Sequence, residues 1–546
     1  MKSMKKLVTL LLSLVMLCAL AMPAMAEDKN DYSITINGAV AGHTYTAYQV
    51  FKGVYYSGNR QVVGKDAEYL SDVQWGDGVD GTAIVTELKA PTTLKALSDK
   101  FANVNADNTD ATAEKVAYIL QGLGDKSEEL DEFARVVGKH LTATKAGETG
   151  EVAAGATDAK IDKLPAGYYF VKDSGKIADG EIATKFLVEV VGNASVTVKA
   201  QAPSIEKEIV GGDAGNHTSV NIGDKVEFKL TAKVPDMANF DTYTFTISDT
   251  LSNGLTFDAS SVVVKIGEKK LVADTNYKLT EPADPETDNT FTIQFTKNQL
   301  VDEVVHGTGA TIVVTYKATL NNNALTTDKE TNKAKLEYSN NPSSSEDKGT
   351  VKTPDVPVYI YDFDIDVDKY DDTDNKDGET ANKEKKLANA EFILYKEVTE
   401  NEQKKTYYYK WDKDSNTVKW VPEKAQATPK TTTTEGKASF QGIAAGKYFL
   451  EETKAPDGYN KLKEPVPVTI TAEYNADGKL TNTTANANTT VNGQYIQKVE
   501  VPNKAGAVLP STGGIGTTIF YVLGSILALG AAVLLIAKKR MNGQDR

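Results

Sequence analysis

Residues 445–459 read Ala-Gly-Lys-Tyr-Phe-Leu-Glu-Glu-Thr-Lys-Ala-Pro-Asp-Gly-Tyr, an amphipathic run that ends in a proline and glycine turn. Such a run is typical of a strand with one buried face. Its first eight residues align without gaps with residues 166–173, and residues 390–396 align more loosely with residues 44–50. We therefore predict that the two ends of the chain carry distant copies of one β domain, although any two amphipathic strands can look alike.

The composition indicates a β-rich, acidic protein. The chain has 546 residues, a formal charge of −14 and only four histidines. Such a charge makes nucleic acid an unsuitable partner. Tyr and Thr are abundant, and Pro and Gly separate short alternating runs, which predicts several all-β domains in series. The sequence contains no GxSxG nucleophile motif, no HExxH zinc-protease motif and no phosphate-binding P-loop, so turnover catalysis is not expected.

The first 26 residues have the form of a secretory signal. Three lysines precede an apolar stretch over residues 7–20, and Ala24-Met25-Ala26 offers small residues for cleavage after Ala26. The only cysteine, Cys18, lies in this segment. The mature chain is therefore expected to be exported and to hold no disulfide and no thiolate metal site.

The other end of the chain carries three features in a fixed order. Leu509-Pro510-Ser511-Thr512-Gly513 is followed by an apolar run over residues 515–537 and then by Lys538-Lys539-Arg540. A helix of that length can cross a hydrocarbon core of about 30 Å, and the positive cluster after it stays in the cytoplasm. An ordinary membrane anchor is one interpretation of this pattern.

The ordered triple resembles the LPxTG sorting signal of Gram-positive surface proteins. The resemblance implies that a sortase recognises Leu509 and Pro510, cuts between Thr512 and Gly513, and joins the acyl group of Thr512 to an amine. It also implies a secreted protein that is anchored to the cell wall after a transient stage as a membrane-anchored precursor.

Composition shifts and prolines divide the chain. We predict immunoglobulin-like β-sandwiches, with two or three helices inserted in the first of them over residues 92–141. The expected segments are a signal peptide (1–26), an N-terminal β domain (31–199), a middle domain (204–342), a C-terminal domain (356–503), a short flexible stem (504–508) and the sorting signal with its transmembrane helix (509–546).

Residues 448–459 resemble the E-box of Cna-B type domains of Gram-positive pilins, written YxLxExxAPxGY, with every defined position matched. In that family a lysine of the first strand forms an amide with an asparagine of the last strand, beside the E-box glutamate. The positions that match here are Lys369, Asn503 and Glu452. A surface lysine, a surface glutamate and a turn asparagine are the alternative.

The chemistry explains the residue types. Burial lowers the pKa of a lysine, so a neutral amine becomes available as a nucleophile. A protonated Glu452 then polarises the Asn503 carbonyl and transfers protons as ammonia leaves. This is a single self-reaction without turnover, so the chain is not an enzyme in the usual sense, and the reaction implies no cofactor and no metal.

The middle domain resembles the Cna-A-like second domain of pilin backbones, in which an aspartate takes the carboxyl role. The resemblance implies Lys207 and Asp249, with Asn332 as the asparagine and Asn340 as the alternative.

In the N-terminal domain Asp173 stands where the acid is expected, but residues 33–37 contain no lysine. We therefore predict no internal amide there, and the lowest resistance to heat and proteases of the three domains.

Polymerising pilins of this family present one lysine near the end of the first domain to the sortase. Lys199 has the position but lacks the Tyr-Pro of the usual motif, and a solvated strand-end lysine is the alternative.

The resemblance implies a major, shaft-forming pilin. Its implied partners are a class C-type sortase, the housekeeping sortase, other copies of the chain, peptidoglycan, minor pilins and a host or partner-cell ligand. A monomeric wall-anchored adhesin is the alternative function.

The acidic run over residues 364–379 suggests calcium binding, but no register supplies the full EF-hand ligand set. We predict a solvated loop there.

Overall fold

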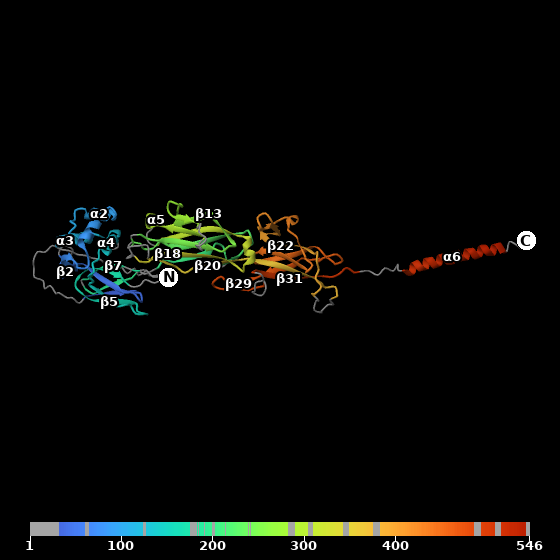
Figure 1. Cartoon of the computed structure of the whole chain (residues 1–546), viewed down its shortest axis with the longest axis horizontal. Coiled ribbons are helices and arrows are strands. Elements are labelled where there is room, and N and C mark those ends of the chain that lie inside the picture. The colour runs from blue at the N-terminus through green and yellow to red at the C-terminus, as the bar shows by residue number, and fades with distance from the viewer. Residues whose placement is uncertain are drawn as a thin grey trace.

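The molecule is an elongated array of β domains. The computed structural model describes residues 32–60, 65–123, 127–174, 183, 185–190, 192–198, 202–212, 215–237, 240, 242–281, 290–303, 309–341, 349–374, 383–484, 493–507 and 515–541. Figure 1 shows the N-terminal, middle and C-terminal domains following one another along the long axis, with helix α6 beyond them. This arrangement agrees with the predicted tandem of β-sandwiches.

The N-terminal domain packs two sheets and a group of helices. Its three-stranded sheet has the order β5-β1-β8 and its second sheet the order β3-β2-β6-β7, with β4 paired to β2. The strands are β1 (Tyr32–Asn37), β2 (Tyr45–Arg60), β3 (Lys65–Trp75), β4 (Gly147–Glu148), β5 (Asp158–Leu164), β6 (Gly167–Asp173), β7 (Lys185–Val190) and β8 (Ala194–Thr197). One core lies between the two sheets, and a second core lies between β2, β3, β6 and the helices.

The described residues of this domain contain four helices. They are α1 (Gly81–Leu88), α2 (Lys95–Phe101), α3 (Asp110–Gln121) and α4 (Glu128–Lys139). The predicted insertion is therefore confirmed, but its start at residue 92 and the number of helices were wrong. Helix α1 begins earlier because Asp80 caps it, accepting a hydrogen bond from Ala83 N at 3.0 Å, and Ile84, Val85 and Leu88 bury one face.

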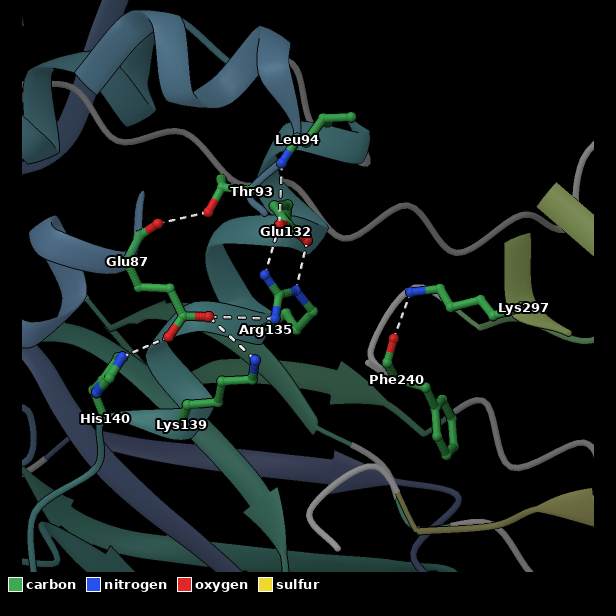
Figure 2. A network of polar contacts seen from close by, with 9 residues as sticks. All are labelled: Glu87, Thr93, Leu94, Glu132, Arg135, Lys139, His140, Phe240 and Lys297. Atoms are coloured by element: carbon green, nitrogen blue, oxygen red, sulfur yellow. Dashed lines mark hydrogen bonds and ion pairs between the residues drawn. The ribbon is translucent and has the colours of Figure 1, made fainter. Parts of the chain in front are cut away.

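A polar network holds α1 and α4 together (Figure 2). The Glu87 carboxylate accepts hydrogen bonds from Arg135 at 3.4 Å, Lys139 at 3.1 Å and His140 at 2.7 Å. Arg135 also makes a two-pronged contact with Glu132, with both nitrogen to oxygen distances at 2.7 Å. Burial disfavours the Glu132 carboxylate, but Arg135, the backbone N–H of Leu94 and, most weakly, Lys297 of the middle domain outweigh it and lower the pKa of Glu132.

The middle domain is a larger sandwich. One sheet has the order β14-β13-β17-β11-β9, and the other has the order β10-β20-β18-β12-β16-β15 with β19 paired to β18. The elements are β9 (Ile205–Ile209), β10 (His217–Ser219), β11 (Lys225–Lys233), β12 (Phe245–Leu251), β13 (Leu255–Ile266), β14 (Lys269–Lys270), β15 (Lys278–Thr280), β16 (Phe291–Phe295), α5 (Lys297–Glu303), β17 (Thr311–Leu320), η1 (Asn322–Thr326), β18 (Glu330–Ser339), β19 (Thr350–Lys352) and β20 (Val356–Tyr361).

The C-terminal domain follows after a single residue, Asp362. Its sheets have the orders β26-β21-β31 and β24-β23-β22-β27-β28, with β25 paired to β22 and a separate ribbon of β29 and β30. The elements are β21 (Phe363–Asp371), β22 (Glu391–Glu400), β23 (Gln403–Asp412), β24 (Thr417–Val421), η2 (Lys424–Gln426), β25 (Lys430–Thr431), β26 (Lys437–Ile443), β27 (Gly446–Lys454), β28 (Val466–Ile470), β29 (Ala472–Tyr474), β30 (Leu480–Thr483) and β31 (Tyr495–Asn503).

The strand over residues 356–361 belongs to the middle sheet. There β20 pairs with β18 and β10, so the boundary between the sheets falls at Asp362 rather than at residue 356. The chain thus passes from one domain to the next as almost continuous β structure, which limits how far the two domains can bend relative to each other.

The end domains share one topology. In the first, β1 pairs antiparallel with β5 and parallel with β8, and in the last, β21 pairs antiparallel with β26 and parallel with β31. The aligned segments 166–173 and 445–452 occupy β6 and β27, and each of these strands pairs with β2 or β22. The sequence repeat therefore corresponds to equivalent strands.

The middle and C-terminal domains share a continuous apolar core, whereas the N-terminal cores are separate. The Asn221 side chain oxygen accepts hydrogen bonds from Trp420 Nε1 and Ala444 N, both at 3.2 Å. Gly442 has φ +69°, and a Cβ there would lie 2.4 Å from Ile222 Cγ1, so this close contact requires glycine. These two domains are thus packed as one unit.

Helix α6 (Ile515–Met541) lies apart from the β domains. Within it, Ile519–Lys539 spans 21 residues at a mean hydropathy of 2.6, long and apolar enough to cross a membrane.

Candidate cross-linking sites and their relatives

The C-terminal site forms where three strands approach the core. Lys369 lies on β21 and Asn503 on the neighbouring parallel strand β31, where Lys369 is in register with Val501. Asn503 stands two residues further along and therefore on the same face. Lys369 Nζ donates to Asn503 Oδ1, and it also donates to Val501 O at 3.2 Å. The sequence-predicted lysine and asparagine are thus in direct contact.

Glu452 reaches this pair from the opposite sheet, on β27. Its Oε1 lies 3.5 Å from Lys369 Nζ and accepts a hydrogen bond from Asn503 Nδ2 at 2.9 Å. Its Oε2 accepts from Leu462 N at 2.8 Å, which holds the carboxyl group in place. One carboxyl group therefore touches both the amine and the amide.

Burial sets the chemistry of the amine. The Lys369 side chain is fully buried, and its Nζ lies 5.9 Å from the centre of the Phe392 ring. Burial lowers the pKa of Lys369 to about 8, against the opposing attraction of Glu452. A lysine amine with such a pKa is neutral far more often than an exposed one, and only the neutral amine has the lone pair needed to attack a carbonyl.

The middle site uses a different geometry. Lys207 lies on β9, whereas Asp249 on β12 and Asn332 on β18 belong to the facing sheet. Lys207 Nζ lies 2.5 Å from Asp249 Oδ2 and 2.6 Å from Asn332 Oδ1. A bond from Lys207 to Asn332 would join the two sheets, whereas one from Lys369 to Asn503 would join neighbours in one sheet.

Tyr316 completes the middle site and was missed from the sequence. Its hydroxyl on β17 accepts hydrogen bonds from Lys207 Nζ at 2.8 Å and from Asn332 Nδ2 at 2.9 Å. Burial raises the pKa of Tyr316 well above its usual value, so the hydroxyl stays neutral. A buried tyrosine in an alternating strand has no distinguishing local pattern. Its role is revealed only by the sheet order, in which β17 and β9 flank β11 and face the sheet that contains β18.

The electrostatics of the middle site resemble those of the C-terminal one. Burial lowers the pKa of Lys207 to about 8 against the attraction of Asp249. Burial also raises the pKa of Asp249, although Lys207 opposes the shift. Desolvation thus favours the neutral forms of both groups, which are the forms needed for a nucleophilic amine beside a proton donor.

The structure separates the two candidate asparagines. Asn332 lies beside Lys207, whereas Asn340 follows the far end of β18, about 26 Å along an extended strand. The backbone N–H of Asn340 donates to Gly349 O at 2.8 Å, and its carbonyl accepts from Ala183 N of the N-terminal domain at 2.8 Å. Asn340 therefore lies at the joint between two domains.

The N-terminal domain has a different pair at the equivalent place. Asp173, at the end of β6, is buried against His43, with 2.7 Å between Asp173 Oδ2 and His43 Nδ1. Residues 32–37 of β1 offer no lysine. The histidine was not predicted, because it precedes β2 in a loop and no motif surrounds it.

The His43→Ala variant is expected to lower the stability of the N-terminal domain by about 2–3 kcal/mol, because the buried Asp173 side chain then loses its hydrogen bond to the imidazole. Differential scanning calorimetry of the full chain would show the earliest transition moving to lower temperature. The control is His140→Ala, whose partner Glu87 is more exposed, with a smaller expected shift. An unchanged first transition in His43→Ala would contradict the role of this pair.

Several predicted residues lie outside the described part of the chain. These are the signal peptide (1–26), Lys199, and Leu509, Pro510, Thr512 and Gly513 of the sorting motif. The acidic run is described only in part, over 364–374, where Asp371 contacts Lys385 and Tyr459.

Three family models match separate parts of the chain. A prealbumin-like fold domain matches residues 373–495, and an LPXTG cell wall anchor motif matches residues 501–543. A model described as Gram-positive pilin backbone subunit 2, Cna-B-like domain, matches residues 222–342. The chain is a homologue of Gram-positive backbone pilins. The model describes the middle domain as Cna-B-like, whereas the sequence suggested the Cna-A type.

Similar whole proteins agree with this conclusion. The chain is 25% identical over 441 residues to the trypsin-resistant surface T6 protein of Streptococcus pyogenes serotype M6, covering 66% of the chain and 74% of that protein. It is 34% identical over 95 residues to fimbrial subunit type 1 of Actinomyces viscosus, covering 17% of the chain and 15% of that protein.

A solved structure supports the fold. The T6 backbone pilin of serotype M6 Streptococcus pyogenes, described as a modular three-domain structure, aligns with a TM-score of 0.51 at 19% identity and covers 89% of this chain and 100% of that one. Together with the anchor motif and α6, these findings make this backbone pilin homologue a cell-wall-anchored surface protein.

Proposed function

We propose that this pilin homologue is the shaft subunit of a covalent surface pilus whose middle and C-terminal domains cross-link themselves. The observation that carries this proposal is the contact of a buried lysine with a buried asparagine beside a carboxyl group, made once in each of these domains. Unreacted, each site would bury charged and polar groups at a considerable cost, which supports a covalent end state.

The reaction balances within the protein. The neutral Nζ of Lys369 attacks Cγ of Asn503, and the carbonyl oxygen gains the negative charge that a protonated Glu452 stabilises. The nitrogen of the new bond loses a proton, the Nδ2 group gains one, and ammonia leaves. The product is one amide bond and one ammonia molecule. The middle site would react in the same way, with Lys207 as the nucleophile, Asn332 as the amide that is attacked and Asp249 as the acid.

The positions of these bonds suit a load-bearing fibre. Lys207 and Asn332 are 125 residues apart, and Lys369 and Asn503 are 134 residues apart. With both amides formed, tension between the chain ends would bypass residues 208–331 and 370–502. Pulling the ends of a subunit could then not unfold these segments.

Subunits would join through the sorting signal. A class C-type sortase would cut after Thr512 and transfer its acyl group to Lys199 of another copy, and the housekeeping sortase would attach the completed polymer to peptidoglycan. Minor pilins and a host or partner-cell ligand are further proposed partners. A monomeric wall-anchored adhesin has the same sorting signal but needs no linking lysine.

An immunoblot of muramidase-released wall material, boiled in detergent, tests the assembly. We expect a ladder of high-mass species from cells that make the natural chain, and monomer only from cells that make the Lys199→Ala chain. Lys199 lies two residues before Gln201-Ala202-Pro203, where the sequence predicts a domain boundary, so we expect its loss to leave folding unchanged. A monomer band in both strains would favour the adhesin, and a ladder in both would discard Lys199 while keeping the pilin.

A further inference from the structure

The chain leaves the C-terminal domain through a hydrogen-bonded segment. The carbonyl of Lys504 accepts from Asn460 N at 2.9 Å, and Ala505 N donates to Thr373 Oγ1 at 2.8 Å. The Asn460 side chain donates to Ala505 O at 3.1 Å. Gly506 N donates to the carbonyl of Gly458, also at 2.8 Å. We call residues 504–506, together with their partners Thr373, Gly458 and Asn460, the exit clasp. The first part of the stem, which the sequence predicted to be flexible, is therefore bound to the domain.

The Asp371 carboxylate holds in place the two segments that bind the stem, the turn of Thr373 and the loop of residues 458–460. Asp371 Oδ1 accepts from the backbone N–H of Thr373 at 2.8 Å and from its hydroxyl, and Oδ2 accepts from Tyr459 OH at 2.8 Å. Lys385 Nζ lies 2.5 Å from the same Oδ2. Burial opposes the charge, but the hydrogen bonds from Lys385, Thr373 and Tyr459 outweigh it and hold the pKa of Asp371 well below its usual range. The loop of Tyr459 and the turn of Thr373 are thus held together.

The clasp lies at a vulnerable place in the chain. It follows Asn503, so the proposed amide at that residue cannot bridge a cut made beyond it. Between Asn503 and Thr512 the only lysine or arginine is Lys504, and its side chain is exposed. Cleavage after Lys504 would separate the folded domain from everything attached to Thr512.

We propose that the exit clasp protects the Lys504–Ala505 peptide bond from trypsin-like proteases and so protects the junction between subunits. Both polar atoms of this peptide group are occupied, the carbonyl oxygen by Asn460 N and the N–H by Thr373. A serine protease must bind this same carbonyl oxygen in its oxyanion hole and hold the flanking chain extended, so cleavage requires the clasp to open first. The role in the fibre rests on the proposed function, whereas the protection itself does not.

Trypsin digestion of the full chain in detergent tests the proposal. Mass spectrometry would follow peptides that begin at Ala505. We compare the natural chain with a Thr373→Val, Asn460→Ala variant, which loses two of the four hydrogen bonds. We expect such peptides to appear at least about tenfold faster from the variant, because opening is easier. Adding Lys504→Gln to the variant should abolish them and so identify the cut.

Equal rates of release from the natural chain and the variant would overturn the proposal. So would release from the natural chain as fast as from the denatured chain. The intact mass of each undigested protein reports separately whether the amides have formed, and the wall immunoblot reports separately whether subunits polymerise. A failure of the clasp and a failure of the proposed function are therefore distinguishable.

Discussion

The Glu452→Gln variant is expected to be heavier than the natural chain by the mass of one ammonia molecule, apart from the small change of the substitution itself. Glutamine keeps the size of the side chain but cannot donate a carboxyl proton to the Asn503 carbonyl or relay protons as ammonia leaves. Intact-mass spectrometry of the full chain would show one amide where the natural chain has two.

The missing bond should also be visible in stability. A cross-link across 134 residues removes conformational entropy from the unfolded chain worth about 5 kcal/mol in the loop-closure model. A loss of that size should lower the melting temperature of the C-terminal domain by about 10–20 °C. Differential scanning calorimetry would measure this shift.

The neighbouring Glu451 provides a matched control. It lies on the same strand but faces outward, where its carboxylate is 2.7 Å from Lys424 Nζ. Glu451→Gln should therefore keep the full ammonia loss and nearly the natural melting temperature. If Glu452→Gln also lost two ammonia molecules, the assignment of Glu452 as the catalytic acid would be wrong.

The second large effect is expected in the middle domain. Asn332→Ala removes the carbonyl that Lys207 would attack, so this chain should retain one ammonia equivalent. The lost cross-link spans 125 residues, and we expect the domain to be destabilised by about 5 kcal/mol, measured by calorimetry or denaturant unfolding. The buried Lys207 would keep Asp249 and Tyr316 as partners, which limits further damage.

Asn340→Ala is the informative comparison, because Asn340 was the competing candidate on the basis of sequence. Its backbone groups bond to Gly349 and Ala183, and alanine preserves both contacts. This chain should lose two ammonia molecules like the natural one. Retention of ammonia in Asn340→Ala together with full loss in Asn332→Ala would reverse the assignment.

The C-terminal site was easier to predict from the sequence than the middle site. The C-terminal trio is carried by a continuous motif around Glu452 and by the first and last strands of one domain, so a local resemblance was enough to name all three residues. The middle site has no comparable motif around its asparagine. Whether Asn332 or Asn340 meets Lys207 depends on how far β18 extends before it leaves the core, and that is a property of sheet packing.

The sequence by itself predicted the sorting signal and the β-rich tandem architecture, which the comparisons and the fold confirm, and it named the C-terminal trio that the structure brings into contact. The export signal stays a prediction. All of these depend on composition, on periodicity and on residues that are close in the chain. Only the tertiary structure revealed Tyr316, the His43–Asp173 pair, the continuous core of the last two domains and the exit clasp. Each of these joins residues on separate strands or loops, and the free energy that selects such contacts comes from burial and from hydrogen bonds that exist only after the sheets have packed.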